Sequence, residues 1–287
     1  MKISQIKKES GIIWSFEIFP PKPASDISVM EKTIAELAAL NPDFISVTCS
    51  AGGSGNSRTA EIAGILKNKY GVEPLAHLTC INSDKDEISR ELKKLEAMGI
   101  ENVLALRGDR IPGAEKGVFS HADELVRFIL DESNRFDISG ACYPETHPES
   151  PSPEKDIEYL KQKVDAGVKR LVTQLFFDNE DYFDFVERAR KAGIDVPIQA
   201  GVMPLVKKSN VDRIISLSGA KIPNKVSRMI AKYYDDPESL MQAGIAYATE
   251  QAFDLAAGGA DGIHVYVMNN PFVAKSVTAN VSSIIGK

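Results

Sequence analysis

The chain has 287 residues, of which 43% are hydrophobic and 26% charged, and its formal net charge is −6. This composition is typical of a globular protein with a full core, and no basic patch stands out to neutralise the phosphates of a nucleic acid. No apolar run is long enough to cross a bilayer, and residues 1–5 lack the apolar core of a signal peptide. We therefore expect a cytoplasmic enzyme with no nucleic-acid or membrane partner.

Short apolar runs alternate with longer helical patterns along the chain. The runs that predict strands span residues 12–19, 44–49, 75–80, 103–106, 138–143, 171–177, 198–203 and 262–268. A pattern of apolar residues at three- and four-residue spacing follows each run. Further helical segments, 225–233 and 238–257, lie between the seventh and eighth strands. Eight such units predict a single (β/α)8 TIM barrel over residues 1–287, with the active site on the loops that follow the strands.

A doubly wound open sheet is the alternative fold. Such a sheet more often carries a Gly-x-Gly-x-x-Gly motif after its first strand. The glycine-rich stretch at residues 51–56 lacks the third glycine, and no Lys-Ser or Lys-Thr follows it as a P-loop requires. The sequence therefore favours the barrel.

Glu17 lies inside the apolar first strand, which Pro20 and Pro21 end because neither proline can donate a ladder hydrogen bond. Burial at this position would raise the pKa of the carboxyl and suit it to proton transfer near neutral pH. A glutamate turned outward to solvent at the strand end is equally compatible with this segment alone.

Polar side chains recur at the predicted carboxyl ends of the strands. They are Glu17, Thr48, His77, Arg107, Asp109, Tyr143, His147, Gln174 and Asn269. One such residue means little, but convergence at nearly every strand end indicates a ligand site. None of the pairs has metal-ligand spacing, the three cysteines form no Cys-x-x-Cys motif, and no serine or cysteine has an obvious base beside it. These features argue against a metal site and a hydrolytic triad.

Two segments could bind a phosphorylated ligand. In the segment 107–109, Gly108 would let a ligand approach the backbone, Arg107 could pair with a phosphate, and Asp109 could pair with an amide-like ring edge. Ser152 as an N-cap, with Pro153 at the first helical position, predicts the start of a helix. On that helix, Asp156 could hold ribose hydroxyls and Lys163 a phosphate. A solvated turn and an exposed helix face are the simpler alternatives.

These segments together resemble methylenetetrahydrofolate reductase. The matching pieces occur in order and at matching spacing, at residues 15–22, 46–48, 51–54, 58–59, 77–80, 106–109, 143–149, 163–167 and 173–178. Each piece is weak alone, but the ordered set is specific and covers almost the whole barrel. The resemblance implies a short bacterial-type chain, without the C-terminal S-adenosylmethionine-binding domain of larger members.

The resemblance also implies a function. It predicts a barrel that binds FAD without a covalent bond and reduces 5,10-methylenetetrahydrofolate to 5-methyltetrahydrofolate with NAD(P)H, by ping-pong hydride transfer. Glu17 matches the catalytic acid of the family, and Asp109 matches an aspartate near the flavin and the pterin. Gln174 matches a folate contact. The FAD contacts of the family are matched by Thr48, His77, Arg107, Gly108, Asp109, Ala141, Tyr143, His147, Asp156 and Lys163.

Two departures from the family pattern leave substrate recognition open. Ile214 falls about where some members carry a phenylalanine that contacts the nicotinamide or the folate, and Asn270 stands where an arginine often occurs. The alternatives are a folate-binding barrel methyltransferase and a reductase subunit that takes electrons from a partner protein. We expect a homo-oligomer. His264, in the last strand, is predicted to be a hydrogen-bonded core histidine.

Overall fold

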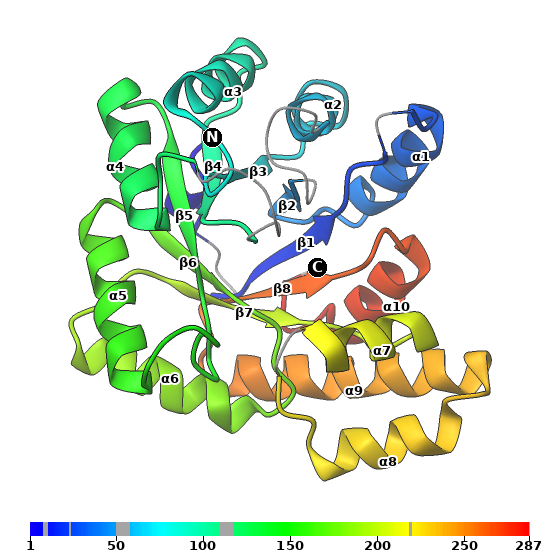
Figure 1. Cartoon of the computed structure of the whole chain (residues 1–287). Coiled ribbons are helices and arrows are strands. Elements are labelled where there is room, and N and C mark those ends of the chain that lie inside the picture. The colour runs from blue at the N-terminus through cyan, green and yellow to red at the C-terminus, as the bar shows by residue number, and fades with distance from the viewer. Residues whose placement is uncertain (8–10, 23, 50–57, 110–116, 218–219, 287) are drawn as a thin grey trace.

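The computed structural model describes residues 1–7, 11–22, 24–49, 58–109, 117–217 and 220–286 (Figure 1). Within these ranges, eight parallel strands close into a barrel in chain order, and β1 pairs with β8. The strands are β1 (Ile13–Ile18), β2 (Phe44–Val47), β3 (Pro74–Thr79), β4 (Asn102–Leu106), β5 (Asp137–Cys142), β6 (Arg170–Thr173), β7 (Ile198–Val202) and β8 (Gly262–Tyr266). The predicted (β/α)8 barrel is confirmed.

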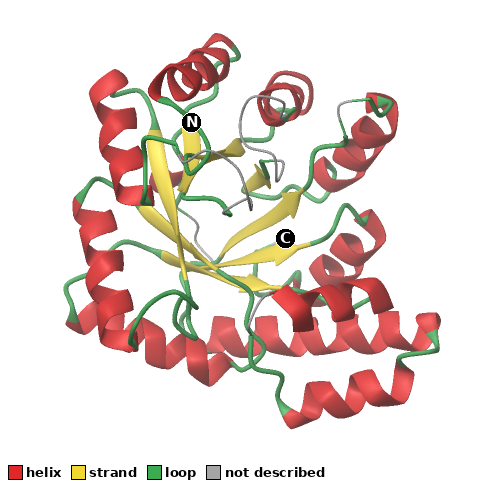
Figure 2. Cartoon of the chain, viewed as in Figure 1, coloured by secondary structure: helices red, strands yellow, loops and turns green. Residues whose placement is uncertain are grey.

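Helices surround the barrel (Figure 2). They are α1 (Ile27–Ala38), α2 (Thr59–Tyr70), α3 (Lys85–Ala97), α4 (Ala122–Glu132), α5 (Pro153–Asp165), α6 (Asn179–Lys191), α7 (Lys208–Leu217), α8 (Asn224–Tyr233), α9 (Pro237–Ala257) and α10 (Pro271–Val281), with a 3-10 turn, η1 (Ile3–Gln5), ahead of β1. Both α7 and α8 precede α9, so the predicted extra helices between strands seven and eight are confirmed.

Local signals in the sequence position the helix ends. The Ser152 hydroxyl accepts a hydrogen bond from the Lys155 amide, with Pro153 in the first turn, as predicted for the start of α5. At α3, Asp84 and Glu87 form a reciprocal capping box. These caps set where α3 and α5 begin, and hence where the loops before them end.

The sixth strand is shorter than predicted. The apolar run was expected to stay in the barrel to residue 177, but β6 ends at Thr173. Beyond it, side chains of α9 bind the backbone: Gln251 Nε2 donates to the Phe176 carbonyl at 3.0 Å, and the Tyr247 hydroxyl donates to the Phe177 carbonyl at 2.5 Å. The run is apolar because Leu175 and Phe177 are buried with residues of α7 and α8, and Phe176 is buried in the main core. Periodicity alone does not separate that role from a buried strand.

Alternation along β1 separates the core from the barrel interior. Trp14, Phe16 and Ile18 belong to the large core between the strands and the helices. Ser15 and Glu17 therefore face inward, because successive side chains of a strand point to opposite faces. The interior near the amino ends of the strands is filled by Ile3, Ile13, Phe44, Leu75 and Leu104. Polar inward-facing residues are thus placed toward the carboxyl ends.

A second, smaller core lies under α7 and α8. It joins Val211 and Ile214 of α7 and Val226 of α8 to Met203 and Leu205, which follow β7. Figure 1 shows α8 on the outer side of α9, away from the barrel. The apolar residues of α7 and α8 are thus buried against the segment that follows β7.

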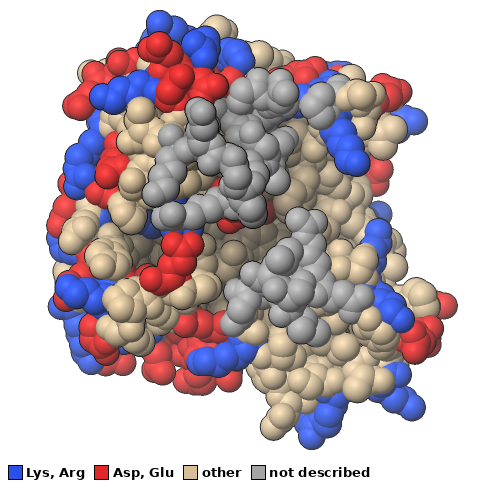
Figure 3. All heavy atoms as spheres, viewed as in Figure 1, with Lys and Arg blue, Asp and Glu red and all other residues tan. Residues whose placement is uncertain are grey.

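The surface gives two further observations. On the face shown in Figure 3, lysine and arginine side chains are interspersed with acidic ones, and the described residues form no broad basic surface there. Across the described ranges, each helix is too short or too polar to span a membrane.

Gly244 in α9 and Gly64 in α2 offer a matched test of helix packing. A Cβ at Gly244 would lie 2.1 Å from the backbone oxygen of Leu205, whereas a Cβ at Gly64 would meet the Met98 sulfur at 2.9 Å. Because backbone cannot move aside as a methionine side chain can, we expect Gly244→Ala to lower the free energy of unfolding by about 2–3 kcal/mol. Gly64→Ala should change it by less than about 1 kcal/mol. Urea denaturation compares the two variants, and equal shifts would contradict this difference in packing.

Candidate active site

Two adjoining cavities lie at the carboxyl ends of the strands. The inner cavity, of about 410 Å³, has Glu17, His77, Gln174 and Tyr266 in its wall, and the outer cavity, of about 420 Å³, lies between α4 and α5. Both cavities are lined by Arg107, Ala122, Ala141, Tyr143, His147 and Lys163. The two cavities therefore form one continuous cleft.

The cleft brings the predicted site residues together. Its inner cavity is lined by Glu17, Thr48, His77, Arg107, Gly108, Asp109, Ala141, Tyr143, His147, Lys163 and Gln174. Asp156 lines the outer cavity. Asn269, by contrast, hydrogen-bonds to the backbone nitrogen and oxygen of Phe19, both at 2.8 Å, and ties the exits of β1 and β8 together.

Glu17 is turned into the barrel and is only 8% exposed. Its Oε2 atom lies 3.3 Å from Ser46 Oγ, 3.5 Å from His77 Nε2 and 3.7 Å from His264 Nε2. The alternative of an outward, solvated glutamate is therefore excluded. Strand alternation places this carboxyl at the floor of the cleft.

The predicted rise in the pKa of Glu17 is wrong. Loss of hydration is the largest single influence and does raise the pKa, but it is outweighed by the close approach of His264, by the charge that His77 and His264 carry when they are protonated, and by a hydrogen bond from Ser46. The net effect lowers the pKa below its usual value. The apolar neighbours in the sequence, such as Phe16, face the outer core, while the inward neighbours are polar. In these surroundings the carboxyl is ionised at neutral pH.

His77 is a neutral ring beside that carboxylate. Burial lowers the pKa of His77 to about 4, although the negative charge of Glu17 acts to raise it. Its Nε2 atom is buried and has no hydrogen-bond partner within the described part of the chain. A buried, unsatisfied nitrogen in the wall of a cavity is suited to contact a ligand there.

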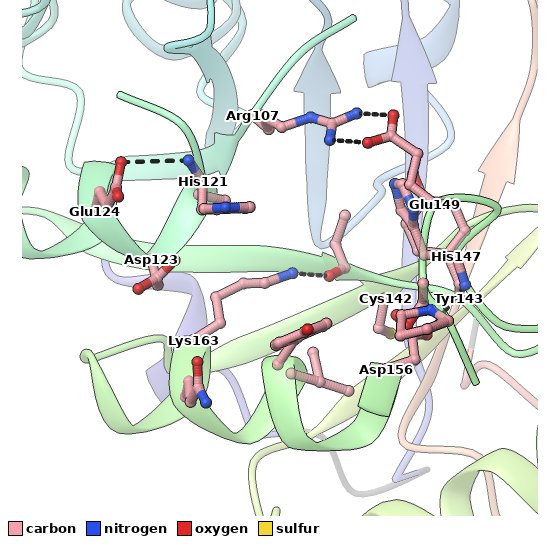
Figure 4. A pocket seen from close by; sticks show the side chains of 17 residues that line it. Arg107, His121, Asp123, Glu124, Cys142, Tyr143, His147, Glu149, Asp156 and Lys163 are labelled. Atoms are coloured by element: carbon pink, nitrogen blue, oxygen red, sulfur yellow. Dashed lines mark hydrogen bonds and ion pairs between the residues drawn. The ribbon is translucent and has the colours of Figure 1, made fainter. Parts of the chain in front are cut away.

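The segment after β4 holds a cation at the junction of the two cavities. The Arg107 guanidinium makes two hydrogen bonds of 2.6 Å with the Glu149 carboxylate, and this pairing raises the pKa of Arg107 (Figure 4). Gly108 has φ +85°, and a Cβ there would lie 3.0 Å from Thr79 Cβ. Glycine at this position therefore permits both the turn and its close approach to β3.

The outer cavity holds a second cation, Lys163 of α5. Its ammonium group donates to the Ala141 carbonyl at 2.6 Å, and burial lowers the pKa of Lys163 (Figure 4). Asp156, on the same helix, accepts a hydrogen bond from the His147 amide at 3.1 Å, and burial raises the pKa of its carboxyl. The cavity thus offers a cation and a carboxylate, which suit a phosphate and hydroxyl groups respectively.

Several polar residues of the site were not predicted from the sequence. Glu149 was part of a matching segment but was given no role. Ser15, Ser46 and Gln199 read as ordinary strand residues, although each is fully buried. The alternation of side chains along a strand could have placed Ser15 on the same face as Glu17. Which residues of other strands lie beside Glu17 depends on the register of strand pairing, which the sequence does not show.

The prediction for His264 is confirmed. The ring is 1% exposed and bonds to Ser15 Oγ at 2.6 Å and Ser46 Oγ at 3.2 Å. Its proximity to Glu17 was not predicted. Among the described residues, no group of three or more His, Cys, Asp or Glu side chains could hold a metal ion.

The fold and the cleft together define a (β/α)8-barrel protein with a buried carboxyl at the floor of an extended ligand site. The chain belongs to the methylenetetrahydrofolate reductase family, whose sequence profile matches residues 2–282. The Escherichia coli 5,10-methylenetetrahydrofolate reductase is 37% identical over 255 residues, which cover 89% of this chain and 86% of that protein. Methylenetetrahydrofolate reductase (NADH) 1 of Arabidopsis thaliana is 34% identical over 298 residues, covering 99% of this chain and 50% of that protein. The chain thus spans about half the length of the plant relatives it matches.

Solved structures share the fold. An uncharacterized protein from Clostridium thermocellum that binds two copies of 5-methyl-5,6,7,8-tetrahydrofolic acid has a TM-score of 0.71 at 15% identity, and the match covers 96% of both chains. Tryptophan synthase from Mycobacterium tuberculosis has a TM-score of 0.53 at 12% identity, covering 96% of this chain and 93% of that one. Because one barrel hosts many chemistries, these likenesses establish the fold alone.

The lowered pKa of His77 predicts how stability depends on pH. The unfolded chain, where the pKa is near 6.5, takes up a proton that the folded protein does not accept until about pH 4. The folded state is therefore destabilised as the pH falls through that window, by about 3 kcal/mol at its acid end. We expect His77→Gln to lose less free energy of unfolding than wild type between pH 7 and 4.5, measured by urea denaturation.

His121→Gln, at an exposed residue beside the outer cavity, is the matched control for the loss of one imidazole. The lowered pKa of Glu17 acts in the same direction at lower pH, since its ionised form contributes stability that is lost as the pH falls below about 4.5. A slope for His77→Gln equal to that of wild type would contradict the neutral state of His77.

Proposed function

We propose that this protein reduces 5,10-methylenetetrahydrofolate to 5-methyltetrahydrofolate with FAD as its cofactor and NAD(P)H as the electron donor. The observation that carries the proposal is the carboxyl of Glu17, buried at the floor of a cleft that is also lined by Arg107 and Lys163. Membership of the reductase family supports it. The cleft combines an acidic group for the folate with cations for an anionic cofactor.

The residues of the cleft fit a flavin nucleotide. His77 Nε2 is unsatisfied in the wall of the inner cavity, and Gly108 lines the same cavity. Arg107 and Lys163 would meet the phosphates, and Asp156 the ribose hydroxyls. Bound there, the flavin would accept hydride from the nicotinamide and supply it to the methylene carbon of the folate.

Glu17 is proposed to donate the proton that opens the five-membered ring of the folate. Its pKa is low in the polar surroundings described above, so a ligand that displaces water from the inner cavity would have to raise it. Asp109 is proposed to position the pterin. Gln174 Oε1 accepts a hydrogen bond from the Leu175 amide at 2.9 Å, which orients the Gln174 amide group with its NH₂ end available to the folate.

The two departures from the family pattern have structural roles of their own. Ile214 is buried in the small core under α7 and α8. Asn270 caps α10 by accepting a hydrogen bond from the Val273 amide at 3.4 Å. We infer that other residues recognise the nicotinamide and the folate tail.

Glu17→Gln separates the two half-reactions. The amide cannot donate the proton, so we expect the variant to bind FAD and accept hydride from the nicotinamide while folate reduction falls by at least about a hundredfold. Stopped-flow absorbance of the flavin measures each half-reaction. Glu91→Gln, at an equally buried glutamate on α3, is the control and should retain both. Normal folate turnover by Glu17→Gln would refute the assigned acid.

The ion pair of Arg107 and Glu149 predicts opposite effects on FAD binding. Without the guanidinium, Arg107→Leu should weaken FAD by about tenfold to a hundredfold. Glu149→Gln removes the carboxylate that competes with phosphate, and should strengthen binding by about threefold or more. Fluorescence titration with FAD measures both, with Arg90→Leu, an exposed arginine on α3, as the control. If Glu149→Gln weakened FAD as Arg107→Leu does, the carboxylate would support the site and would not compete for it.

One preparation tests the overall function against its alternatives. We expect the purified protein to show a flavin absorbance spectrum that bleaches with NADH or NADPH and recovers with methylenetetrahydrofolate. A flavin that neither nicotinamide bleaches would indicate a subunit that takes electrons from a partner protein. A colourless protein that takes up no added FAD but binds folate would favour the methyltransferase alternative.

A further inference from the structure

Four polar side chains of the barrel interior are more completely buried than Glu17. They are Gln199 of β7, Ser15 of β1, His264 of β8 and Ser46 of β2, each no more than 1% exposed. None of the four lines the inner or outer cavity. The proposed reaction uses none of them directly, yet they are in contact with one another and with Glu17.

The amide of Gln199 sets the direction of the hydrogen bonds. Its Nε2 atom donates to the Ile263 carbonyl at 3.1 Å and to Ser15 Oγ at 2.7 Å. The Ile13 carbonyl also lies 3.5 Å from Nε2, and a reversed amide would set its oxygen against both the Ile13 and the Ile263 carbonyls, which only accept. Nε2 is therefore the end that faces Ser15, although Oε1 then has no partner among the described residues. Ser15 Oγ is then an acceptor from Gln199, and its own proton is directed at His264 Nδ1, 2.6 Å away.

That direction determines the tautomer of His264. With Nδ1 accepting, the neutral ring carries its proton on Nε2. The opposite tautomer would leave the buried proton of Ser15 without an acceptor among the described residues, which is unfavourable. The ring plane is held by Phe44, stacked at 5.9 Å between centroids, and by the edge-on contact of Tyr266 at 5.4 Å.

The Nε2 proton points toward Glu17. His264 Nε2 lies 3.2 Å from Ser46 Oγ, and Ser46 Oγ lies 3.3 Å from Glu17 Oε2. With Nε2 donating to Ser46, the Ser46 hydroxyl is free to donate to the carboxylate. We propose that Gln199, Ser15, His264 and Ser46 are positioning residues that form a chain of donors, all pointing one way and ending on Glu17 Oε2.

The chain of donors has a consequence for proton donation by Glu17. It binds Oε2 on the barrel side, so Oε1 is the oxygen left to meet a ligand, and it stabilises the ionised form. Among the described residues, the titratable groups that face Glu17 are His77 of β3 and His264 and Tyr266 of β8. Tyr266 donates its own proton to the Thr173 carbonyl at 2.6 Å. The effect on catalysis rests on the proposed role of Glu17 as the acid.

The tautomer can be measured without any assay of activity. In the intact protein labelled with ¹⁵N-histidine, His264 is identified by comparison with variants at His77, His121 and His147, since the chain has four histidines. At pH 8 we expect its Nε2 to carry the proton and its Nδ1 to be bare. A proton on Nδ1 would overturn the proposal.

Two serine variants test whether the chain of donors acts on the carboxyl of Glu17. Ser15→Ala should convert the His264 signal to a mixture of tautomers. Ser46→Ala removes the final donor, so the pKa of Glu17 should rise and the alkaline limb of folate reduction should move up by about 0.5–1 pH unit, with flavin reduction by the nicotinamide unchanged. Ser139→Ala, at a buried serine of β5, is the control and should alter neither measurement.

An unchanged tautomer in Ser15→Ala, or an unmoved alkaline limb in a folded and active Ser46→Ala variant, would overturn the proposal. If the protein proved not to be a reductase, the tautomer measurements would still decide whether the chain of donors exists. Failure of this inference is thus distinguishable from failure of the proposed function.

Discussion

The site depends on the register in which β1 pairs with its two neighbours. That register sets Glu17 beside Ser46 of β2 and Ser15 beside His264 of β8. A slip of one residue would turn Phe16 into the cleft and Glu17 toward the helices, because side chains alternate strictly between the two faces. Closure of the barrel thus decides both where the carboxyl lies and which groups surround it.

The surroundings of Glu17 illustrate how burial and hydrogen bonding compete. Burial alone would favour the neutral carboxyl, and it is the largest single influence. The barrel opposes it with donors from β2 and β8 and with a second ring from β3. The outcome is an ionised group held near the bottom of the cleft. Any role as a proton donor therefore requires that the ligand itself shift this balance.

Elsewhere in the cleft, cations are held by the protein before any ligand is considered. Arg107 is bound by Glu149, and Lys163 by the Ala141 carbonyl. These contacts orient the two side chains and limit the cost of burying their charges. The phosphates of an anionic cofactor would then replace the Glu149 carboxylate and the Ala141 carbonyl as hydrogen-bond acceptors from Arg107 and Lys163. This arrangement gives the proposed FAD site a physical basis that does not depend on family resemblance.

The sequence by itself determined the order of strands and helices, the cap at Ser152 and the set of polar residues at the strand ends. Those features are local: they follow from periodicity, from capping residues, and from the rule that the strands of a barrel all expose the same end. It did not determine where β6 ends, since a run buried against helices has the same apolar pattern as a run buried in a sheet. Only the tertiary structure decided the state of Glu17, because the side chains of Ser46, His77 and His264 reach it from strands far apart in the chain. The protonation state of Glu17 and the direction of the hydrogen bonds around it depend on these neighbours, which only the closed barrel brings together.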